Sequence, residues 1–443
     1  MLPRMSIKGC LTLTLLFAGL AAGCNDKDNA DKCCTTMDAC KTAGLDAISP
    51  CDTGVCFDSV CVRGCTADSD CNNSPDTPVC MSGVCSCSKS DTCGGQRPIC
   101  DTASHDCRAC TADSECDSGA CDTGGGACVD AAAILYAAAG GAGSGDCTND
   151  KPCSLAFAGT KVDDDHTWIV MQSGAYKDAL TMKHNATIVG TDSTWDLPAA
   201  GVVLNKGTYL LRHLMISTGD VATGITCTGC TVTLDHIQAI GGTGATGLTG
   251  GPSVSASNST FKSWPINLSV ADKLQVVLDR STFTASPIKV TSAKTGNVKL
   301  TNSVLADSGA ANALEIVNTA GGTIVAAITN DTFANAAISC DGNALDDGDS
   351  AVFTSNIFYN TTLPKAADSC TFDYNLGSPA ISQGKHDIVG DPKFVDAANH
   401  NFHLAAGSPA IDASISVAAT RIDLDNVVRP QGKAYDIGAF ESK

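Results

Sequence analysis

The chain has 443 residues, a formal net charge of −19 and 43% hydrophobic residues, with 26 cysteines but only 5% aromatic residues. Acidic residues exceed basic ones by 18 to 7 over residues 24–130 and by 29 to 19 over residues 131–443. Such a surface repels nucleic acids and anionic lipid headgroups, and it argues against unassisted binding of polyanionic glycans.

The amino-terminal segment is typical of a secretory signal peptide. Arg4 and Lys8 precede an apolar run from Leu11 to Ala22. Its 12 residues are too few for a transmembrane helix, which needs about 20. We therefore assign residues 1–23 to a signal peptide and residues 24–32 to a tether.

The end of this segment, Leu20-Ala21-Ala22-Gly23-Cys24, resembles the lipobox of bacterial lipoproteins. The resemblance implies cleavage before Cys24 and acylation of its thiol and new amino group. The protein is then expected in the bacterial cell envelope, held by lipid at the outer membrane or cell surface. The alternative is an ordinary signal-peptidase site followed by an incidental cysteine.

The cysteine count indicates an oxidising compartment. Without Cys10 in the signal peptide and Cys24 as the lipid site, 24 of the 26 cysteines remain, 18 of them between Cys33 and Cys128. Even counts in each region favour disulfides over free thiols. The remaining six form three local couples: Cys147 with Cys153, Cys227 with Cys230, and Cys340 with Cys370.

One of these couples also matches a redox motif. Cys227 and Cys230 have the Cys-x2-Cys spacing, yet they lie between expected strands, without the helix that lowers a thiol pKa in such motifs. We expect a structural disulfide or two buried thiols there.

Residues 33–130 contain a four-cysteine repeat whose units span Cys65–Cys85, Cys87–Cys107 and Cys110–Cys128. Each unit opens with Cys-x5-Cys, and a less regular unit of six cysteines precedes them. Units this small cannot bury a sufficient core, so cross-links must hold them. Zinc bound by four cysteines is the alternative, disfavoured because the units lack a Cys-x2-Cys ligand pair. The pattern resembles Cys-rich repeats of myxobacterial surface proteins and, loosely, Dickkopf-type modules, and it favours a stiff, protease-resistant stalk.

A second repeat, with a period of 22 to 28 residues, runs through residues 209–358. In most periods the first, third and eighth residues are apolar and the fifth is polar. Alternation of this kind indicates strands with one buried face, and a fixed short period indicates a solenoid. The fifth position is occupied by His213, His236, Asn258, Arg280, Asn302, Asn330 and Ser355.

The signature of leucine-rich repeats is missing from these periods, so we expect a right-handed parallel β-helix. Each period forms one coil of about three short strands, and about nine coils stacked ~4.8 Å apart give a rod of roughly 45 Å. The fifth residue is expected in a tight turn with left-handed geometry, which Asn tolerates.

Both ends of this region resemble known β-helix proteins. Residues 134–158 and 167–190 resemble the first segment and first coils of pectate-lyase-like β-helix proteins. Residues 391–414 and 421–442 resemble the closing segment of bacterial surface proteins of the choice-of-anchor Q type. The matching residues there are Asp391-Pro392, Phe394, Phe402, Leu404, Ser408-Pro409-Ala410-Ile411-Asp412, Asp423, Asp425, Arg429-Pro430, Asp436-Ile437-Gly438-Ala439 and Glu441.

The expected fold is therefore all-β. A small disulfide-rich repeat region, residues 33–130, precedes a single-stranded right-handed parallel β-helix over residues 131–443, with a closing motif from about residue 388. One departure is Asn426, where the family usually has Gly. The resemblance implies a secreted or surface protein but no single activity.

The closing motif supplies the strongest candidate metal ligands, which are Asp412, Asp423, Asp425 and Asp436. Their simplest role is structural, with Arg429 neutralising the carboxylates while the segment seals the helix; Ca2+ binding is the alternative. Asp163-Asp164-Asp165-His166 reads as a solvated turn. Residues 341–349 offer enough oxygens for Ca2+, but their spacing does not match an EF-hand loop.

No catalytic residue can be assigned. A lyase of this fold needs carboxylates for Ca2+ and a basic residue that abstracts a proton. Arg212 and Arg280 have no evident Asp partner in adjacent coils, and Asp235 and Asp279 lie two coils apart. The NTD, GHG and RIK motifs of polygalacturonases are absent. Packing is expected for both Trp195 and Trp264, with sugar stacking as the alternative.

The sequence therefore favours a non-catalytic surface lipoprotein, attached to the membrane through the lipid on Cys24. Its β-helix is expected to bind a polysaccharide or a surface protein. The alternatives are a polysaccharide lyase or glycoside hydrolase of the pectate-lyase-like superfamily, and a structural envelope protein. The sequence indicates no certain cofactor for any of these functions; Ca2+ is the one candidate.

Overall fold

The computed structural model describes the chain from Val55 to Ser442, with gaps at 58–59, 63–64, 72–78, 82–83, 88–89, 91–92, 102, 104–105, 221–222, 243, 271–272, 293, 310, 320–322, 341–349, 365–369, 379–383 and 418–419. The signal peptide, Cys24, the tether and the acidic loop 341–349 lie outside the described residues. The chain divides into two compact units, residues 1–110 with 125–127, and residues 111–124 with 128–443. Within the described residues, no helix is long and apolar enough to cross a membrane.

The first unit is built from short antiparallel hairpins in which two cysteines face each other. Cys56 lies opposite Cys61, Cys80 opposite Cys85, and Cys100 opposite Cys107. The hairpins are β1 (Val55–Phe57) with β2 (Val60–Val62), β3 (Val79–Met81) with β4 (Val84–Ser86), and β5 (Ile99–Asp101) with β6 (Asp106–Arg108). A 3-10 turn, η2 (Asp68–Cys71), precedes β3.

Disulfides connect the β3–β4 and β5–β6 hairpins to the Cys-x5-Cys segment before each of them. The first cysteine of a unit pairs with the third, and the second with the fourth. The pairs are Cys65 with Cys80, Cys71 with Cys85, Cys87 with Cys100, and Cys93 with Cys107. A disulfide-rich repeat region is confirmed.

The last repeat contributes residues 111–124 to the second unit, where Cys116 and Cys128, the second and fourth cysteines, are also paired. Its elements are η4 (Asp113–Glu115), β7 (Cys121–Asp122) and β8 (Ala127–Cys128), and η5 (Ala131–Ala133) follows them.

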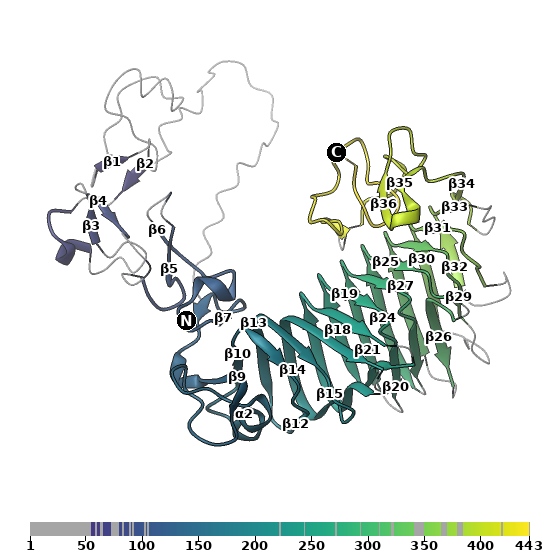
Figure 1. Cartoon of the computed structure of the whole chain (residues 1–443). Coiled ribbons are helices and arrows are strands. Elements are labelled where there is room, and N and C mark those ends of the chain that lie inside the picture. Colours follow the sequence, from purple (N-terminus) through teal and green to yellow (C-terminus); the bar gives the residue numbers. More distant parts are fainter. Residues whose placement is uncertain are drawn as a thin grey trace, which may run out of the picture. The chain divides into compact units, whose positions relative to one another are not determined.

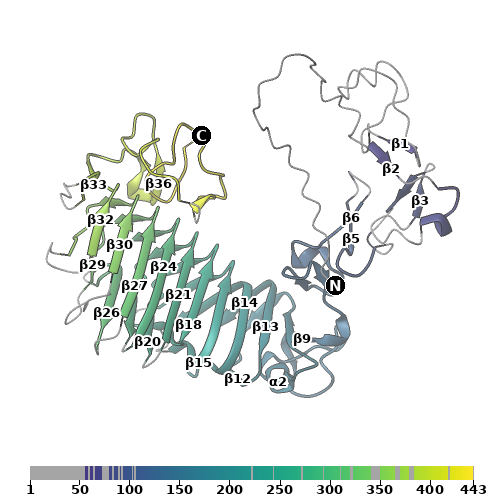
Figure 2. The same ribbon diagram turned by 180° about the vertical axis from the view of Figure 1, so that it is seen from behind.

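The second unit is a parallel β-helix of about eight turns, visible in Figure 1 as a row of stacked arrows. Three rows of parallel strands form its sides. The expected all-β solenoid is confirmed by the register, in which Val254, Val276 and Val298 occupy the same position of successive coils. Figure 2 shows the same stack from behind.

The first row lies before the left-handed turn and contains β9 (Ile134–Ala142), β10 (Trp168–Met171), the start of β13 (Ala186–Asp196), the middle of β14 (Val202–Gly219), the end of β15 (Thr223–Asp235), β18 (Ser253–Ser257), β21 (Lys273–Asp279), β24 (Thr295–Thr301), β27 (Thr323–Thr329), β30 (Ser350–Thr354) and β32 (Cys370–Asp373). The second row follows the turn, with β11 (Gly174–Tyr176), the ends of β13 and β14, β16 (Gln238–Gly241), β19 (Thr260–Lys262), β22 (Thr282–Thr284), β25 (Val304–Ala306), β28 (Thr332–Ala334), β31 (Ile357–Tyr359), β33 (Leu376–Ser378) and β34 (Ile388–Val389). The third row completes each coil, with β12 (Leu180–Met182), the starts of β14 and β15, β17 (Thr246–Gly250), β20 (Ile266–Val270), β23 (Ile288–Ser292), β26 (Leu314–Asn318) and β29 (Ile338–Ser339).

Alternation along each strand sends every second side chain into one continuous core. In β21, Leu274, Val276 and Leu278 are buried. Aromatic residues stack from coil to coil inside, as in the pair Phe261 and Phe283, whose ring centroids lie 4.9 Å apart. Truncating such a buried ring is typically worth about 3–5 kcal/mol of stability.

The fifth residue of each repeat has the left-handed geometry that the sequence predicts. The φ angles of the seven residues lie between 46° and 61°. These angles turn the chain between the first and second rows without a glycine, and Asn tolerates them at lower cost than bulky residues do.

A buried ladder of hydrogen bonds runs beside these turns. From His236 onward, the residue after each left-handed residue donates its backbone N–H to a side chain one coil further on. The bonds run from Ile237 to Ser259, Ser259 to Ser281, Ser281 to Ser303, Ser303 to Asp331, Asp331 to Asn356, Asn356 to Asn375 and Asn375 to Asp387, at 2.7 to 3.2 Å. The acceptors from Ser259 to Asn375 are buried, so each bond satisfies an N–H that water cannot reach.

Additional segments cover the first coil and one outer face of the last coils. At the start, α2 (Leu155–Lys161) buries Leu155 and Ala158 in the core, and Ser154 caps it by accepting from the backbone N–H of Phe157. At the other end, the closing segment contains β35 (Phe394–Asp396), η6 (Ala397–Asn399) and β36 (Asn401–Leu404), and it packs on the outer face of β25 and β28.

Replacing Asp331 by Asn is expected to stabilise the protein. One carboxylate oxygen of Asp331 accepts from Ser303 and the other has no partner, and burial raises the pKa of this carboxyl well above its ordinary value. Asn356 occupies the same position one coil later, where its side-chain oxygen accepts from Asp331 and its NH2 group donates to the carbonyl of Ile328. An Asn at position 331 can therefore use both its oxygen and its nitrogen in hydrogen bonds. We expect a gain of about 1–3 kcal/mol at pH 7 in urea unfolding.

The sign of the pH dependence separates this effect from a packing change. A folded pKa that is raised makes the wild-type contribution most favourable below the unfolded pKa of about 4, and that contribution is lost as pH rises through the folded pKa. The gain from Asp331→Asn should therefore vanish in acid. Asp307→Asn is the control of opposite sign: burial raises the pKa of this carboxyl, but hydrogen bonds from His400 and Asn335 outweigh burial and lower it. A gain from Asp331→Asn that does not depend on pH would contradict this role.

Candidate functional site

A cavity of about 910 Å³ lies beside the first coils, inside the second unit. Residues 112–119 form one wall, and the turns and strands of three successive coils form the other. Its polar lining comes from Asp113, Asp117, Asp192, Thr194, His213, His236 and Gln238.

Asp113 fixes residues 111–124 to the β-helix. Its carboxylate forms a buried ion pair with Arg212 and accepts from Nδ1 of His213 at 2.9 Å. The Arg212 guanidinium also lies over the ring of Trp168, 5.3 Å from its centroid. Burial alone would raise the pKa of Asp113, but the hydrogen bonds from His213 and Cys121 and the nearby charges lower it, so the carboxylate is ionised.

Asp113 lies 99 residues from Arg212, so no local sequence pattern predicts this pair. The repeat does contain a weak signal. Asp68, Ser90 and Asp113 occupy the same position of three repeats. Each accepts from the backbone N–H of its unit's third cysteine, at 2.7, 3.2 and 2.8 Å respectively. The docking of the Asp113 carboxylate on the β-helix, through Oδ1 to Arg212 and Oδ2 to His213, was invisible in the sequence.

Two further coils repeat an acid–base pair on the edge of the helix. Asp235 accepts from His236 through one oxygen, and from Ser257 and Asn258 through the other. Asp279 does the same with Arg280, Thr301 and Asn302.

Each of these carboxylates bonds to the residue that follows it and to two residues of the next coil. One Asp therefore serves two successive coils, and Asp235 and Asp279 lie two coils apart. Burial tends to raise the pKa of Asp235, yet its hydrogen bonds lower it overall. The coil that carries Arg212 has no Asp at this position, and Asp113 supplies the carboxylate there.

The outer face of the second row is open between residues 111–124, docked at the first coils, and the closing segment, docked at the last coils. We call this surface the open flank, and define it as the outward side chains of the end of β14, of β16, β19 and β22: Met215, Ser217, Gln238, Ile240, Thr260, Lys262, Thr282 and Thr284. From β25 onward the same face is buried, because Val304, Ala306 and Ala334 pack against Phe402 and Phe440 of the closing segment. Four coil steps separate Met215 from Val304, or about 19 Å along the axis.

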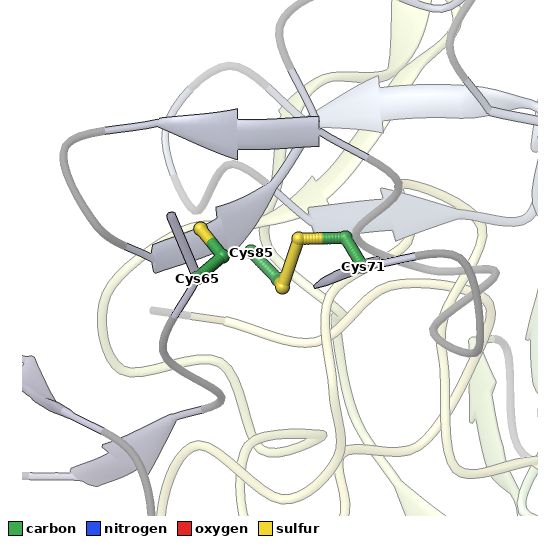
Figure 3. A group of neighbouring side chains, drawn as sticks. All are labelled: Cys65, Cys71 and Cys85. Carbon is green, nitrogen blue, oxygen red and sulfur yellow. A yellow bond between two sulfur atoms is a disulfide. The ribbon is translucent and has the colours of Figure 1, made fainter. Parts of the chain in front are cut away.

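Three groups of cysteines have the spacing of metal ligands, but their sulfur atoms are used in disulfides. Figure 3 shows Cys65, Cys71 and Cys85 close together, with the Cys71–Cys85 bond in yellow. Cys65 is bonded to Cys80. A disulfide leaves no thiolate for zinc, so the geometry agrees with cross-linked repeats.

The four candidate calcium ligands of the closing motif accept hydrogen bonds from different groups, most of them backbone N–H groups. Asp412 accepts from the N–H groups of Lys433 and Ala434, and Asp423 from those of Asp425, Val427 and Glu441. Asp436 accepts from Asp412 and Ser442, while Asp425 pairs with Nε2 of His403. Calcium binding at these residues stays a prediction that no contact tests.

Arg429 lies at the centre of the closing segment, fully buried. It donates to Glu441 at 3.1 Å and to the carbonyls of Asp436 and Gly438. Burial raises the pKa of Glu441, and the carboxylate in turn accepts from the N–H groups of Gln431 and Asp436. The network satisfies the backbone of a segment that has little regular structure.

The remaining sequence candidates have structural environments. Trp195 and Trp264 are fully buried, so neither can stack on a sugar. Asp163 accepts from the backbone and ring of His166 in an exposed turn. Disulfides join Cys147 to Cys153, Cys227 to Cys230, and Cys340 to Cys370.

Comparison with known proteins yields one solved structure to report. The crystal structure of pectate lyase Pel9A is similar over 70% of this chain and 96% of that chain, with 15% sequence identity and a TM-score of 0.46. No protein-family model matches the chain, and no curated protein matches it. The β-helix assignment therefore rests on the strand pairing described above, and no activity is transferred.

Replacing Arg429 by Met is expected to destabilise the closing segment strongly. The change leaves the buried Glu441 carboxylate without its cation, a loss of about 3–5 kcal/mol for comparable buried pairs. Hydrogen exchange of residues 421–442 should accelerate. The double variant Arg429→Met/Glu441→Gln should recover part of the loss, and EDTA or Ca2+ should leave the melting temperature unchanged. A melting temperature that rises with Ca2+ and falls in EDTA would show that the carboxylates hold calcium instead.

Proposed function

We propose that this protein is a lipid-anchored surface protein of the bacterial envelope that binds a linear, neutral or weakly charged glycan along the open flank of its β-helix. The observation that carries the proposal is the open flank itself. It is an exposed polar strip, bounded by a docked segment at each end and next to the cavity that contains His213 and His236.

The chemistry of the open flank suits hydroxyl recognition. Thr260, Thr282 and Gln238 offer hydroxyl and amide groups, and Lys262 offers a single cation. Coils repeat these positions every ~4.8 Å, a spacing close to the length of one sugar unit in an extended chain. Met215 and Ile240, which are 42% and 45% exposed, supply apolar contact for the faces of sugar rings.

Three carboxylates on the edge of the helix are engaged in hydrogen bonds, which favours binding over turnover; Asp117 and Asp192 also line the cavity. Asp113, Asp235 and Asp279 each accept at least three hydrogen bonds or ion pairs. The lining residues of the cavity include neither Lys nor Arg, whereas a lyase needs a basic residue to take the α-proton. A hydrolase needs two carboxyl groups at a fixed separation, and in this cavity Asp117 and Asp192 would have to supply them.

Two histidines at the cavity favour a catalytic alternative. His213 and His236 face the cavity and each is bonded to a carboxylate, an arrangement that orients a histidine for proton transfer. A polysaccharide lyase or hydrolase that uses them is the second candidate.

Attachment to the membrane is proposed from the sequence alone. Cys24 ends the lipobox-like motif, and acyl chains contribute about 0.8 kcal/mol per buried CH2, so that several chains make a stable anchor. The disulfide-linked repeats between residues 33 and 130 would then hold the β-helix away from the bilayer.

Replacing Cys24 by Ser is expected to release the protein from the membrane. In cells fed a labelled fatty acid, the natural chain should carry the label and sediment with membranes, and the Cys24→Ser chain should do neither. A Cys24→Ser chain that remains in the membrane fraction after a high-salt wash would show that another segment anchors it.

Substitutions on the open flank are expected to weaken glycan binding. On an array of neutral and weakly charged glycans, the full chain carrying both Gln238→Ala and Lys262→Ala should bind at least about tenfold more weakly, which corresponds to a combined loss of about 1.4 kcal/mol. Lys289→Ala is the matched control, because Lys289 lies on the third row in an exposed ion pair with Glu315. Silence of the natural chain on the array, or equal loss in Lys289→Ala, would overturn the proposal.

A further inference from the structure

Two histidines stand next to each other on successive coils at the cavity. His213 and His236 occupy the same repeat position, and their ring centroids lie 5.1 Å apart. Both have left-handed backbone angles, which fix where each side chain leaves the turn. Both line the cavity and are partly exposed, with 38% and 52% of their side chains accessible.

The two rings are held in the same tautomer. Nδ1 of His213 lies 2.9 Å from Asp113 and Nδ1 of His236 lies 3.0 Å from Asp235. An ionised carboxylate only accepts hydrogen bonds, so each Nδ1 carries the hydrogen and each Nε2 keeps its lone pair in the neutral ring. Neither Nε2 has a hydrogen-bond partner in the part of the chain that the structure describes.

This arrangement is the one that metal-binding histidines use. A ligating imidazole almost always donates its other N–H to a carboxylate or carbonyl, which orients the ring and raises its basicity. Two imidazoles that share one tetrahedral ion at Zn–N distances of about 2.0–2.1 Å place their centroids about 5 Å apart. The observed separation of 5.1 Å is compatible with this geometry, although rings on neighbouring coils have a similar spacing in any case, as Phe261 and Phe283 do at 4.9 Å.

We infer that Nε2 of His213 and Nε2 of His236 together bind one divalent transition-metal ion, such as Zn2+, Ni2+ or Cu2+, at the wall of the cavity. Imidazole nitrogen is a preferred ligand of these ions and a poor ligand of Ca2+ and Mg2+. Among the described residues, groups of three potential ligand atoms within 4.8 Å of one another contain only cysteines. The histidine site therefore has two protein ligands, and its other positions are open to water or to donor atoms of a bound molecule.

An open site of this kind extends the chemistry of the cavity. Hydroxyl or carboxylate oxygens of a ligand on the neighbouring open flank can complete the coordination of the ion. The metal site does not depend on the proposed glycan, because ion binding is measured with the protein alone.

The test is titration of the full chain, with its disulfides intact, with Zn2+ and Ni2+ in a calorimeter. We expect one site that is lost when both histidines are replaced, and a decrease in affinity of at least about tenfold for His213→Asn or His236→Asn alone. Asn is the conservative choice because Asn258, Asn302 and Asn330 occupy the same left-handed position in other coils. A β-sheet circular dichroism spectrum and a cooperative melting transition in the Asn variants show that the fold is intact.

His386→Asn is the matched control. His386 also pairs with an aspartate, Asp373, at 3.0 Å, but its ring stacks on Tyr374 and not on a second histidine. Its replacement should change the affinity less than about twofold. Electron paramagnetic resonance of the Cu2+-loaded chain should show coupling to two imidazole nitrogens, reduced to one in either single Asn variant.

Two results would overturn the inference. One is Zn2+ affinity that persists in the double Asn variant. The other is a Cu2+ spectrum that the His213→Asn and His236→Asn substitutions leave unchanged. Failure of glycan binding on the array would leave the metal site unaffected, so the two proposals fail separately.

Discussion

At each first turn of the β-helix from His236 onward, a left-handed residue leaves the next backbone N–H directed toward the following coil, where a buried side chain accepts it. Ser259, Ser281 and Ser303 meet this requirement in the middle of the rod, and Asp331, Asn356 and Asn375 meet it further on. Burying an N–H without an acceptor lowers the stability of the protein by about 1–3 kcal/mol. The ladder therefore fixes the register of successive coils and, with it, the position of every side chain on the edge.

Because the register is fixed, the edge presents one side chain per coil in a straight line, and the chain uses this line differently along its length. At the first coils, Asp113 docks on Arg212 and His213. At the last coils, Asn330 and Ser355 bond to Asp436 and Ser414 of the closing segment. Between these contacts the second row is exposed, and on the edge Arg280 already donates to Asn426 of the closing segment.

The periodic features of the fold could be predicted from the sequence, and the docked contacts could not. The fifth-position residues from His213 to Ser355 indicate the turn because their geometry follows from neighbouring residues alone. The sixth-position acceptors were missed, since a polar residue in an alternating strand reads as exposed, whereas Ser281 and Asp331 are fully buried. The pairing of Asp113 with Arg212 depends on tertiary docking across 99 residues, which no local pattern encodes.

The most direct test of binding without turnover is product analysis after prolonged incubation of the full chain with each polysaccharide that it retains, with and without Ca2+ or Zn2+. Mass spectrometry and the absorbance of unsaturated uronates report hydrolysis and elimination separately. We predict that the chain retains the polysaccharide while its length distribution stays unchanged. Shortened or unsaturated products that accumulate with time, and disappear when His236 is replaced by Asn, would contradict the central claim and make the cavity an active site.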